Sequence, residues 1–352
     1  MKTIRFPGLV DLHVHLRDPG QTEKEDFYTG TMAALAGGYT TVFDMPNNID
    51  PIMNKQKLDE KIAVAKQKIV CDIGFHFGSL GDNLKEFSKV KNEAFGLKLY
   101  LNVTTGNYLL EPDNLVKIYA AWPEDKPILV HAEADIIDTV LEAVRRSGHR
   151  THVCHVSSKA ELEPIIKAKQ DGWPVTCGVT PHHLFLTKAD KERLGNYATM
   201  KPVLKTQADQ DFLWANLDAI DVFESDHAPH TKAEKDGAEE VFGVPGLETT
   251  LPLLLQAERE GKISREQIID KCSICPAKIM NIKIDAQTYS EIEQIEYEIK
   301  NEELKTKCGW SPFAGRKVFG KVQKVFIGGT KVYEDGEVLI KAGEGAVLKP
   351  IV

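Results

Sequence analysis

The chain has 352 residues, of which 42% are hydrophobic and 27% charged, the ordinary balance of a globular protein with a sizeable core. A formal net charge of -8 argues against nucleic acid or an anionic membrane as a binding partner. No apolar stretch approaches the ~20 residues that a membrane-spanning helix needs, and six scattered cysteines are typical of a reduced cytoplasmic protein.

Short apolar runs alternate with helix-forming segments from residue 8 to residue 226. The predicted strands are 8–15, 40–45, 70–78, 95–101, 128–133, 151–156, 175–179 and 221–226. Helical patterns lie between most of them, at 24–36, 55–68, 112–122, 135–147, 159–171 and 207–217. This alternation predicts a parallel (β/α)8 TIM barrel. An open doubly wound sheet is the structural alternative, but no G-x-G-x-x-G motif follows the first strand.

The pattern changes beyond residue 246. Helices are predicted at 247–260 and 264–280, whereas the polar and acidic segment 287–307 has no clear period. Two short strands, 318–326 and 330–339, are joined by Gly328 and Gly329. We therefore expect a barrel domain over residues 6–285 and a small β annex from residues 1–5 and 286–352, built largely from the segment 318–339 and the tail.

Two histidines separated by one residue end the first predicted strand. Because strand side chains alternate between faces, His13 and His15 point the same way, and Asp11 and Arg17 share that face. Two imidazoles at the carboxyl end of a strand can hold one divalent metal ion. The strand is too apolar to be an exposed edge, so metal binding is a better interpretation than two stacked surface histidines. Arg17 could then hold an anionic ligand beside the metal.

Further chemically active residues stand on later strands. His131, His155 and Asp226 each lie at the carboxyl end of a predicted strand, and in a βα barrel those ends meet at one mouth. Each could by itself be a satisfied core residue, but their shared placement predicts a common site. Lys98 interrupts an apolar strand, where a buried ammonium is penalised. It either reaches up to the mouth or, as a neutral amine, takes up carbon dioxide to form a metal-bridging carbamate.

Longer motifs extend this pattern over nearly the whole chain. The run from residue 6 to residue 47 contains GLVDLHVHLRDPG, AALAGG and DMPN. GLKLYLN begins at residue 96, PHHLFL at residue 181 and SDHAPHT at residue 225, and PGLET and GWSPF follow. These motifs resemble the amidohydrolase superfamily and, within it, the dihydroorotases, especially the dihydroorotase domain of the animal-type multifunctional pyrimidine polyprotein.

The resemblance implies a centre with two zinc ions. Its six ligands would be His13, His15, Lys98, His131, His155 and Asp226. Lys98, carboxylated by carbon dioxide, and a hydroxide would bridge the two ions. Lys98 would hold both ions, whereas Asp226 would bind one of them and also act as the general acid/base of the reaction.

The resemblance also implies a set of substrate-binding residues. They are Arg17, Asn47, Thr104, Thr105, Lys201, His230 and Phe242. Three of them, Arg17, Asn47 and His230, match contacts to the substrate carboxylate, and residues 102–107 are expected to form a loop over the mouth. Lys201 stands where the family usually has arginine, so the bidentate fork for a carboxylate is lost.

A third zinc ion, which animal members of the family can carry, is not expected here. Those members use a cysteine at position 154 and a glutamate at position 178. This chain has Cys154, but Gly178 offers no side-chain oxygen. Strand alternation also places Cys154 on the face opposite His155.

The expected activity is the reversible cyclisation of N-carbamoyl-L-aspartate to L-dihydroorotate plus water, in pyrimidine biosynthesis. A hydantoinase, dihydropyrimidinase or allantoinase would share the metal centre, but Arg17 and the DHAPH motif favour dihydroorotase. A non-catalytic structural domain is the other alternative, although such domains typically lose metal ligands. The short segment before the first strand predicts fusion to other pyrimidine-pathway domains, and we also expect a homodimer in the cytoplasm.

Overall fold

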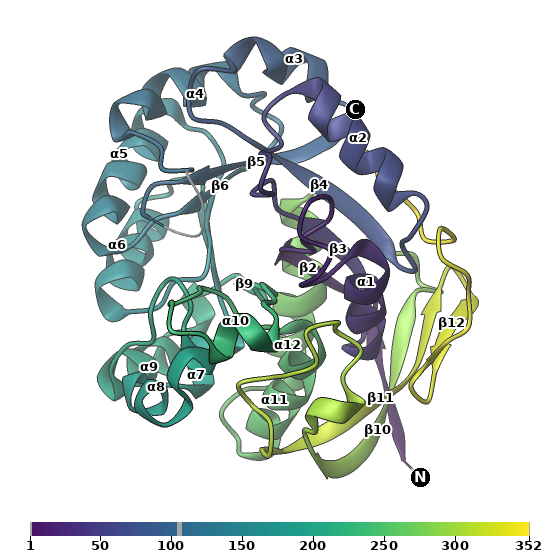
Figure 1. The fold of residues 1–352 in the computed structure, drawn as a ribbon. Coiled ribbons are helices and arrows are strands. Elements are labelled where there is room, and N and C mark those ends of the chain that lie inside the picture. Colours follow the sequence, from purple (N-terminus) through teal and green to yellow (C-terminus); the bar gives the residue numbers. More distant parts are fainter. Residues whose placement is uncertain (1, 104–107, 352) are drawn as a thin grey trace.

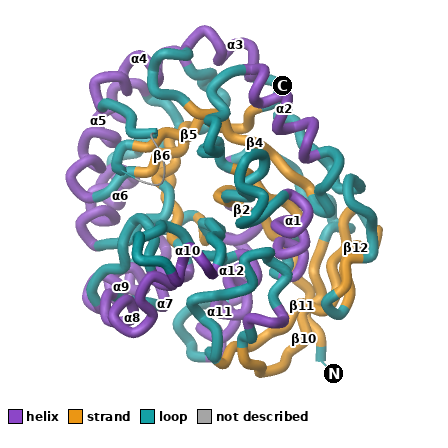
Figure 2. The backbone as a smooth tube through the Cα atoms, viewed as in Figure 1, coloured by secondary structure: helices purple, strands orange, loops and turns teal. Residues whose placement is uncertain are grey.

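The computed structural model describes residues 2–103 and 108–351, and its centre is a ring of parallel strands (Figure 1). The strands follow one another in chain order: β2 (Leu9–Val14), β3 (Tyr39–Asp44), β4 (Asp72–Gly78), β5 (Ala94–Tyr100), β6 (Ile128–His131), β7 (Thr151–Val153), β8 (Val175–Val179) and β9 (Val222–Phe223). Figure 2 shows these strands surrounded by helices. The predicted (β/α)8 barrel is confirmed, and every predicted strand of the ring is present.

Most of the helices cover the outside of the ring. They are α1 (Phe27–Ala36), α2 (Lys55–Ala65), α3 (Phe87–Val90), α4 (Leu115–Ala121), α5 (Ile137–Ser147), α6 (Lys159–Gln170), α7 (Pro181–Phe185), α8 (Lys188–Leu194), α9 (Gln207–Ala215), α10 (Lys232–Asp236), α11 (Leu247–Arg259), α12 (Arg265–Ile269) and α13 (Cys275–Ile279). α1 starts later than predicted because the Asp26 carboxylate caps it, accepting hydrogen bonds from the amides of Tyr28 and Thr29 at 2.9 and 3.0 Å. A π-helical turn, Asp270–Ile274, joins α12 to α13.

The core lies between the strands and the helices. Every residue of β2, β3 and β5 is buried, as expected for strands that are covered on both faces. The largest apolar cluster combines Phe75 of β4 with Phe27 of α1 and Leu254 of α11. Fully burying a side chain of this size contributes ~1.5–3 kcal/mol to stability.

The barrel closes between β2 and the residues that follow β9. Val14 and His227 form a parallel bridge there. The Asp11 carboxylate accepts hydrogen bonds from the amides of His13 and Ser225 at 3.0 and 3.1 Å. β9 has only two residues, so few backbone hydrogen bonds connect it to β2. The Asp11 side chain therefore links β2 to the segment that follows β9.

The annex is a five-stranded antiparallel sheet beside the barrel (Figure 1). Its order is β1 (Thr3–Pro7), β10 (Tyr289–Glu298), β11 (Lys317–Ile327), β12 (Thr330–Glu334) and β13 (Glu337–Val338). Three of these strands, β11 to β13, lie in the expected segment 318–339 or begin one residue before it, whereas the ten-residue β10 was not predicted, because it lies within the segment that showed no period. Four of its ten residues are glutamates, the strand is only partly buried, and register shifts interrupt its pairing with β11.

A loop of the annex reaches the mouth of the barrel. The Glu248 carboxylate of α11 accepts hydrogen bonds from the amides of Lys305 and Thr306 at 2.8–3.0 Å. Further along the same loop, the Trp310 indole Nε1 donates to the backbone carbonyl of His230 at 2.7 Å. The annex is therefore attached to a segment that carries a predicted site residue.

Two further features of the fold concern the cysteines and the length of the helices. All six cysteines are unpaired thiols, and only Cys275 is not fully buried. Within residues 2–103 and 108–351, no helix has the length and apolar character needed to cross a bilayer.

A buried ion pair between β3 and α2 provides a test of the packing. Lys61 Nζ lies 2.6 Å from Asp44 Oδ2, and both side chains are 1% exposed. Replacing Lys61 by methionine leaves the Asp44 carboxylate buried without its cation. We expect the free energy of unfolding, measured by chemical denaturation, to fall by ~3–5 kcal/mol.

The control for this prediction is the exposed ion pair between Arg145 and Glu142 on α5. We expect Arg145→Met to leave the denaturation midpoint unchanged, since solvent screens exposed pairs. Equal losses of stability in the two variants would contradict the structural role of the buried pair.

Candidate metal and active site

A small, half-open pocket lies at the carboxyl ends of the barrel strands. The pocket is lined by His13, His15, Arg17, Asn47, Tyr100, His131, His155, Lys201, Asp226, Ala228, Phe242 and Gly243. Most of the residues predicted to bind metal or substrate are therefore brought together.

His13 and His15 face the same carboxylate, as strand alternation predicts. Their Nε2 atoms lie 3.3 and 3.1 Å from Asp226 Oδ1. The three ligand atoms lie within 4.8 Å of one another, close enough to hold one metal ion. Burial, reinforced by the nearby Glu224 carboxylate, raises the pKa of Asp226 to about 7. A bound cation would lower that pKa again.

His131 and His155 form the second part of the cluster. His131 Nδ1 lies 3.0 Å from His155 Nε2, and the His155 ring centroid is 5.1 Å from that of His13. His155 comes after the end of β7 and has a left-handed backbone, with φ 37°. All four predicted histidine ligands are thus neighbours at the bottom of one pocket.

Side-chain oxygens contact the outward nitrogens of two of these histidines. Asn47 Oδ1 accepts a hydrogen bond from His15 Nδ1 at 2.6 Å, and Glu133 Oε1 lies 3.4 Å from His131 Nε2. A proton held on the outward nitrogen leaves the inward nitrogen free to bind a metal. Sequence reasoning missed Glu133, although it follows His131 by two residues and strand alternation could have suggested it.

The protonation states of the histidines fit metal binding. Burial, together with the charges of neighbouring groups, holds the pKa values of His13, His15 and His155 well below their usual range. Burial also lowers the pKa of His131. Neutral imidazoles keep a lone pair for coordination, so four of them with one carboxylate fit a divalent ion such as zinc.

Lys98 on β5 lies beside this cluster and is fully buried. It does not reach solvent at the mouth, which was one of the two interpretations of its sequence position. Its Nζ donates a hydrogen bond to Cys154 Sγ at 3.1 Å. Sulfur is a weak acceptor, so this contact compensates poorly for the burial of an ammonium.

The predicted orientation of Cys154 is wrong. Alternation placed it opposite His155, but β7 ends at Val153 and the left-handed backbone of His155 breaks the alternation. Both side chains consequently approach His13.

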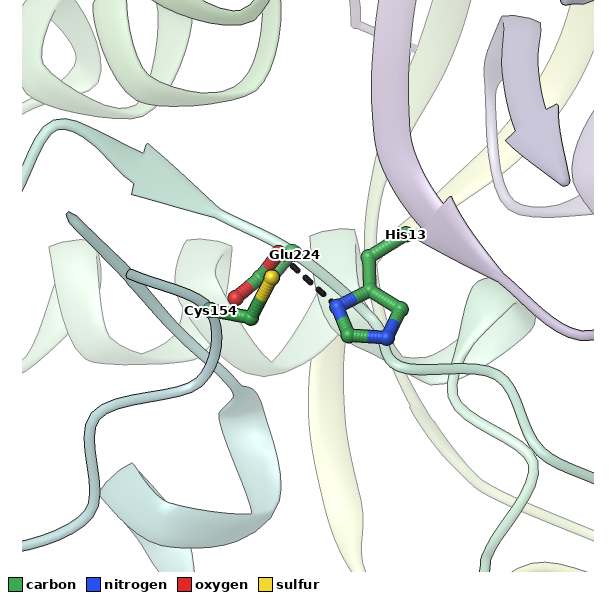
Figure 3. Close-up of side chains that lie close together, drawn as sticks. All are labelled: His13, Cys154 and Glu224. Carbon is green, nitrogen blue, oxygen red and sulfur yellow. Dashed lines mark hydrogen bonds and ion pairs between the residues drawn. The ribbon is translucent and has the colours of Figure 1, made fainter. Parts of the chain in front are cut away.

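The sequence argument about Gly178 also changes. A β-carbon at position 178 would lie 2.5 Å from Glu224 Oε1, so the space beside Gly178 is filled by a carboxylate from another strand. Figure 3 shows His13, Cys154 and Glu224 pointing toward one another, and their ligand atoms lie within 4.8 Å of one another. The missing carboxylate at position 178 therefore does not leave Cys154 without a carboxylate neighbour.

Arg17 lies at the pocket but not on the strand. β2 ends at Val14 and Arg17 has φ 63°, so a loop rather than strand alternation brings it there. Its Nε donates to the carbonyl of Pro229 at 3.1 Å, and its Nη2 lies 3.4 Å from His230 Nε2. Lys24, which sequence reasoning missed, has its Nζ 3.4 Å from His230 Nδ1. Lys24 also pairs with Glu234 at 2.7 Å, and His230 Nε2 lies 3.0 Å from the carbonyl of Phe242. Of these three residues only Arg17 lines the pocket, where its guanidinium suits an anionic substrate.

The remaining predicted residues are placed as follows. Lys201 and Phe242 both line the pocket, with Lys201 Nζ 5.3 Å from the Phe242 ring centroid. Thr104 and Thr105 lie outside the described residues. His183, from the PHHLFL motif, has its nitrogens 2.8 Å from Thr180 Oγ1 and 3.0 Å from the carbonyl of Pro202.

The fold and the pocket together define a barrel protein with a histidine-rich metal-binding mouth. The sequence model of the amidohydrolase family matches residues 4–332. A dihydroorotase of Pyrococcus horikoshii is 38% identical over 98% of this chain and 85% of its own length. The chain therefore belongs to the amidohydrolase family, and within that family it groups with the dihydroorotases.

Other relatives differ in length or in activity. The multifunctional protein CAD of Squalus acanthias is 42% identical, and the alignment covers 98% of this chain but 16% of that protein. An L-hydantoinase from Arthrobacter aurescens has a TM-score of 0.93 at 26% identity, covering 99% of this chain and 89% of its own. An inactive dihydroorotase-like domain of a Chaetomium thermophilum CAD-like protein has a TM-score of 0.85 at 27% identity, covering 99% and 100%.

Two buried histidines provide a test of the metal site. We expect His131→Asn to lose most of the bound metal, because an inward nitrogen is removed from the cluster. His183→Asn is the matched control, since its nitrogens are engaged by Thr180 and Pro202, and it should keep the wild-type content. The metal content per folded chain, measured by mass spectrometry, checks both variants. The reverse pattern would contradict the assignment.

Proposed function

We propose that this chain catalyses the reversible cyclisation of N-carbamoyl-L-aspartate to L-dihydroorotate and water. The observation that carries the proposal is a single pocket lined by both the Arg17 guanidinium and the cluster of four histidines with Asp226. Such a pocket can hold a substrate carboxylate on one side and hydrolyse a cyclic amide on the other. The similarity to dihydroorotases over nearly the whole chain supports the proposal.

The metal centre is the first part of the proposal. Two zinc ions would be held by His13, His15, Lys98, His131, His155 and Asp226. For Lys98 to serve both ions, its neutral amine nitrogen adds to the carbon of carbon dioxide and releases a proton, which gives a carbamate whose single negative charge is shared by two oxygens. When bound, the two ions would polarise the substrate carbonyl and acidify the attacking water.

Asp226 moves the proton of the reaction. In the hydrolytic direction it takes a proton from the water that forms the new C–O bond, and delivers it to the ring nitrogen as the C–N bond breaks. In cyclisation Asp226 takes a proton from the ureido nitrogen as the C–N bond forms and passes it to the departing carboxylate oxygen, which takes a second proton from solution and leaves as water. Its Oδ1 lies within 3.3 Å of the Nε2 atoms of His13 and His15, at the proposed metal site, which supports this role.

The substrate carboxylate belongs on the cationic side of the pocket. The Arg17 guanidinium offers N–H donors there, and the Asn47 amide keeps its NH2 group after its oxygen accepts from His15. We assign His230 to the same group, because its ring lies beside Arg17, with its nitrogens facing the Phe242 carbonyl and Lys24. Lys201 adds a point charge without a bidentate fork. We also assign Thr104 and Thr105 to the loop that covers the substrate, and Phe242 to its apolar edge.

Two alternatives use the same fold. A hydantoinase would share the metal centre but has no need of a carboxylate-binding arginine, so Arg17 favours dihydroorotase. An inactive domain would be expected to lose metal ligands, whereas all six predicted ligands are present in this chain. Their presence favours an enzyme.

The setting of the domain is proposed from the relatives. We infer that the chain works in the cytoplasm as a homodimer, fused to other pyrimidine-pathway domains. The short share of the multifunctional relative that it matches supports fusion. Residues 6–285 would form the catalytic unit, with residues 1–5 and 286–352 packed against it.

The activity can be tested with the zinc-loaded chain. We expect it to interconvert carbamoyl aspartate and dihydroorotate, and to leave a plain hydantoin largely unchanged. Hydrolysis creates one further ionised carboxylate and releases a proton, so alkaline pH favours ring opening and acid pH favours cyclisation.

The role of Arg17 can be tested by mutation. Arg17→Met should raise KM for dihydroorotate more than the exposed control Arg145→Met. Zinc-loaded protein that turns over only hydantoin would contradict the proposal.

The carbamate can be tested through Lys98. We expect Lys98→Ala to lose most of its metal and activity, because both ions lose a shared anionic ligand. A short-chain carboxylic acid added to this variant should partly restore both. Wild-type zinc content in Lys98→Ala, without any added acid, would rule out a bridging role.

A further inference from the structure

Glu224 is a fully buried carboxylate that has no assigned role in the proposed reaction. It follows the last strand of the ring, β9, and precedes Asp226 by two residues. It does not line the pocket, so a bound substrate would not touch it. Burying a carboxylate is unfavourable unless hydrogen bonds compensate for it, so its contacts indicate what it does.

Both carboxylate oxygens of Glu224 are engaged by the metal-binding segments. Oε2 accepts a hydrogen bond from His13 Nδ1 at 3.2 Å (Figure 3). Oε1 accepts a hydrogen bond from the backbone amide of His155. His152 Nε2 also faces Oε2 at 3.7 Å. One carboxylate therefore joins the end of β2 to the residue that follows β7, across the barrel interior.

The contact with Glu224 fixes the tautomer of the His13 ring. An ionised carboxylate accepts hydrogen bonds but does not donate them, so this contact requires the ring proton to be on Nδ1. The lone pair is then on Nε2, which faces Asp226 Oδ1 at 3.3 Å. Glu224 thus selects the tautomer of His13 that can bind a metal at the mouth.

The contact with His155 holds an unfavourable backbone. A left-handed conformation disfavours a residue with a β-carbon by ~1–2 kcal/mol, and His155 has φ 37°. Because β7 has already ended, the hydrogen bond that the His155 amide donates to Glu224 takes the place of a ladder bond. Without it, the His155 ring would not be held toward His131.

Gly178 makes room for this carboxylate. Position 178 pairs with Val222 in the sheet, and a β-carbon there would lie 2.5 Å from Glu224 Oε1. Any other residue at position 178 would therefore displace the carboxylate that contacts both histidines.

From these contacts we propose that Glu224 is a positioning residue, which orients His13 and His155 for metal binding. The inference rests on the metal centre of the proposed function. The other use of the same cluster is a third metal ion held by His13, Cys154 and Glu224. The hydrogen bonds from His13 and His155 favour positioning, since they already occupy both oxygens of Glu224.

The test is the affinity of the full chain for cobalt, measured by competition with a chelator, together with the visible spectrum of the bound ion. We expect Glu224→Gln to bind two cobalt ions about 10- to 100-fold more weakly than wild type, with an altered spectrum. Glu248→Gln is the matched control, because that carboxylate also accepts hydrogen bonds from backbone amides but contacts the annex loop. It should retain the wild-type affinity and spectrum.

A second variant keeps the test valid if Glu224→Gln does not fold. Gly178→Ala keeps Glu224 in the chain, but the added β-carbon displaces its carboxylate, and this variant should also weaken cobalt binding. Wild-type affinity and spectrum in both variants would overturn the positioning role alone. Three cobalt ions in the wild type, one of them lost in both Glu224→Gln and Cys154→Ser, would make Glu224 a ligand instead. A wild-type chain that binds no cobalt would overturn this proposal and the proposed metal centre together.

Discussion

The hydrogen bonds that close the barrel between β2 and β9 place the groups of the site. His15 and Asp226 lie 211 positions apart in the sequence, yet their side chains come within 3.1 Å of each other. β9 is too short to close the ring by backbone pairing alone, so the buried carboxylate of Asp11 adds bonds to both strands. The metal-binding geometry thus depends on the part of the ring that has the fewest ladder bonds.

The sequence predicted the ring well because its strands are buried on both faces. Such strands appear as continuous apolar runs, and any His or Lys within them stands out. The charged strand β10 was missed because its exposure and its bulges hide the two-residue period. Its pairing with β1 is a contact between distant parts of the chain, which no local pattern reveals.

The site was predicted less completely than the fold. His13 and His15 could be found because strand alternation still holds at the end of β2. Cys154 was misplaced because the backbone leaves the strand at that point, and a positive φ at a histidine has no sequence signal. Glu133 and Glu224 were overlooked for another reason, since an acid at the end of a strand also fits a solvated surface residue.

The metal side and the substrate side of the pocket are built from different kinds of secondary structure. The histidines and Lys98 stand on strands or directly after them, whereas Arg17, Lys24 and His230 come from loops. Strands hold ligands rigidly, while loops can change without disturbing the ring. The L-hydantoinase with a TM-score of 0.93 and 26% identity shows that this fold tolerates wide change in sequence.

The position of His230, on the substrate side of the pocket, also depends on the annex loop. Trp310 holds the backbone of His230 from 80 positions away in the sequence, and Glu248 anchors the same loop through Lys305 and Thr306. The length of chain between these two attachments therefore determines where the backbone of His230 lies at the mouth. Evolution could therefore retune which acid the pocket accepts by changing the length of a loop outside the barrel, without altering any residue that touches the metal or the substrate.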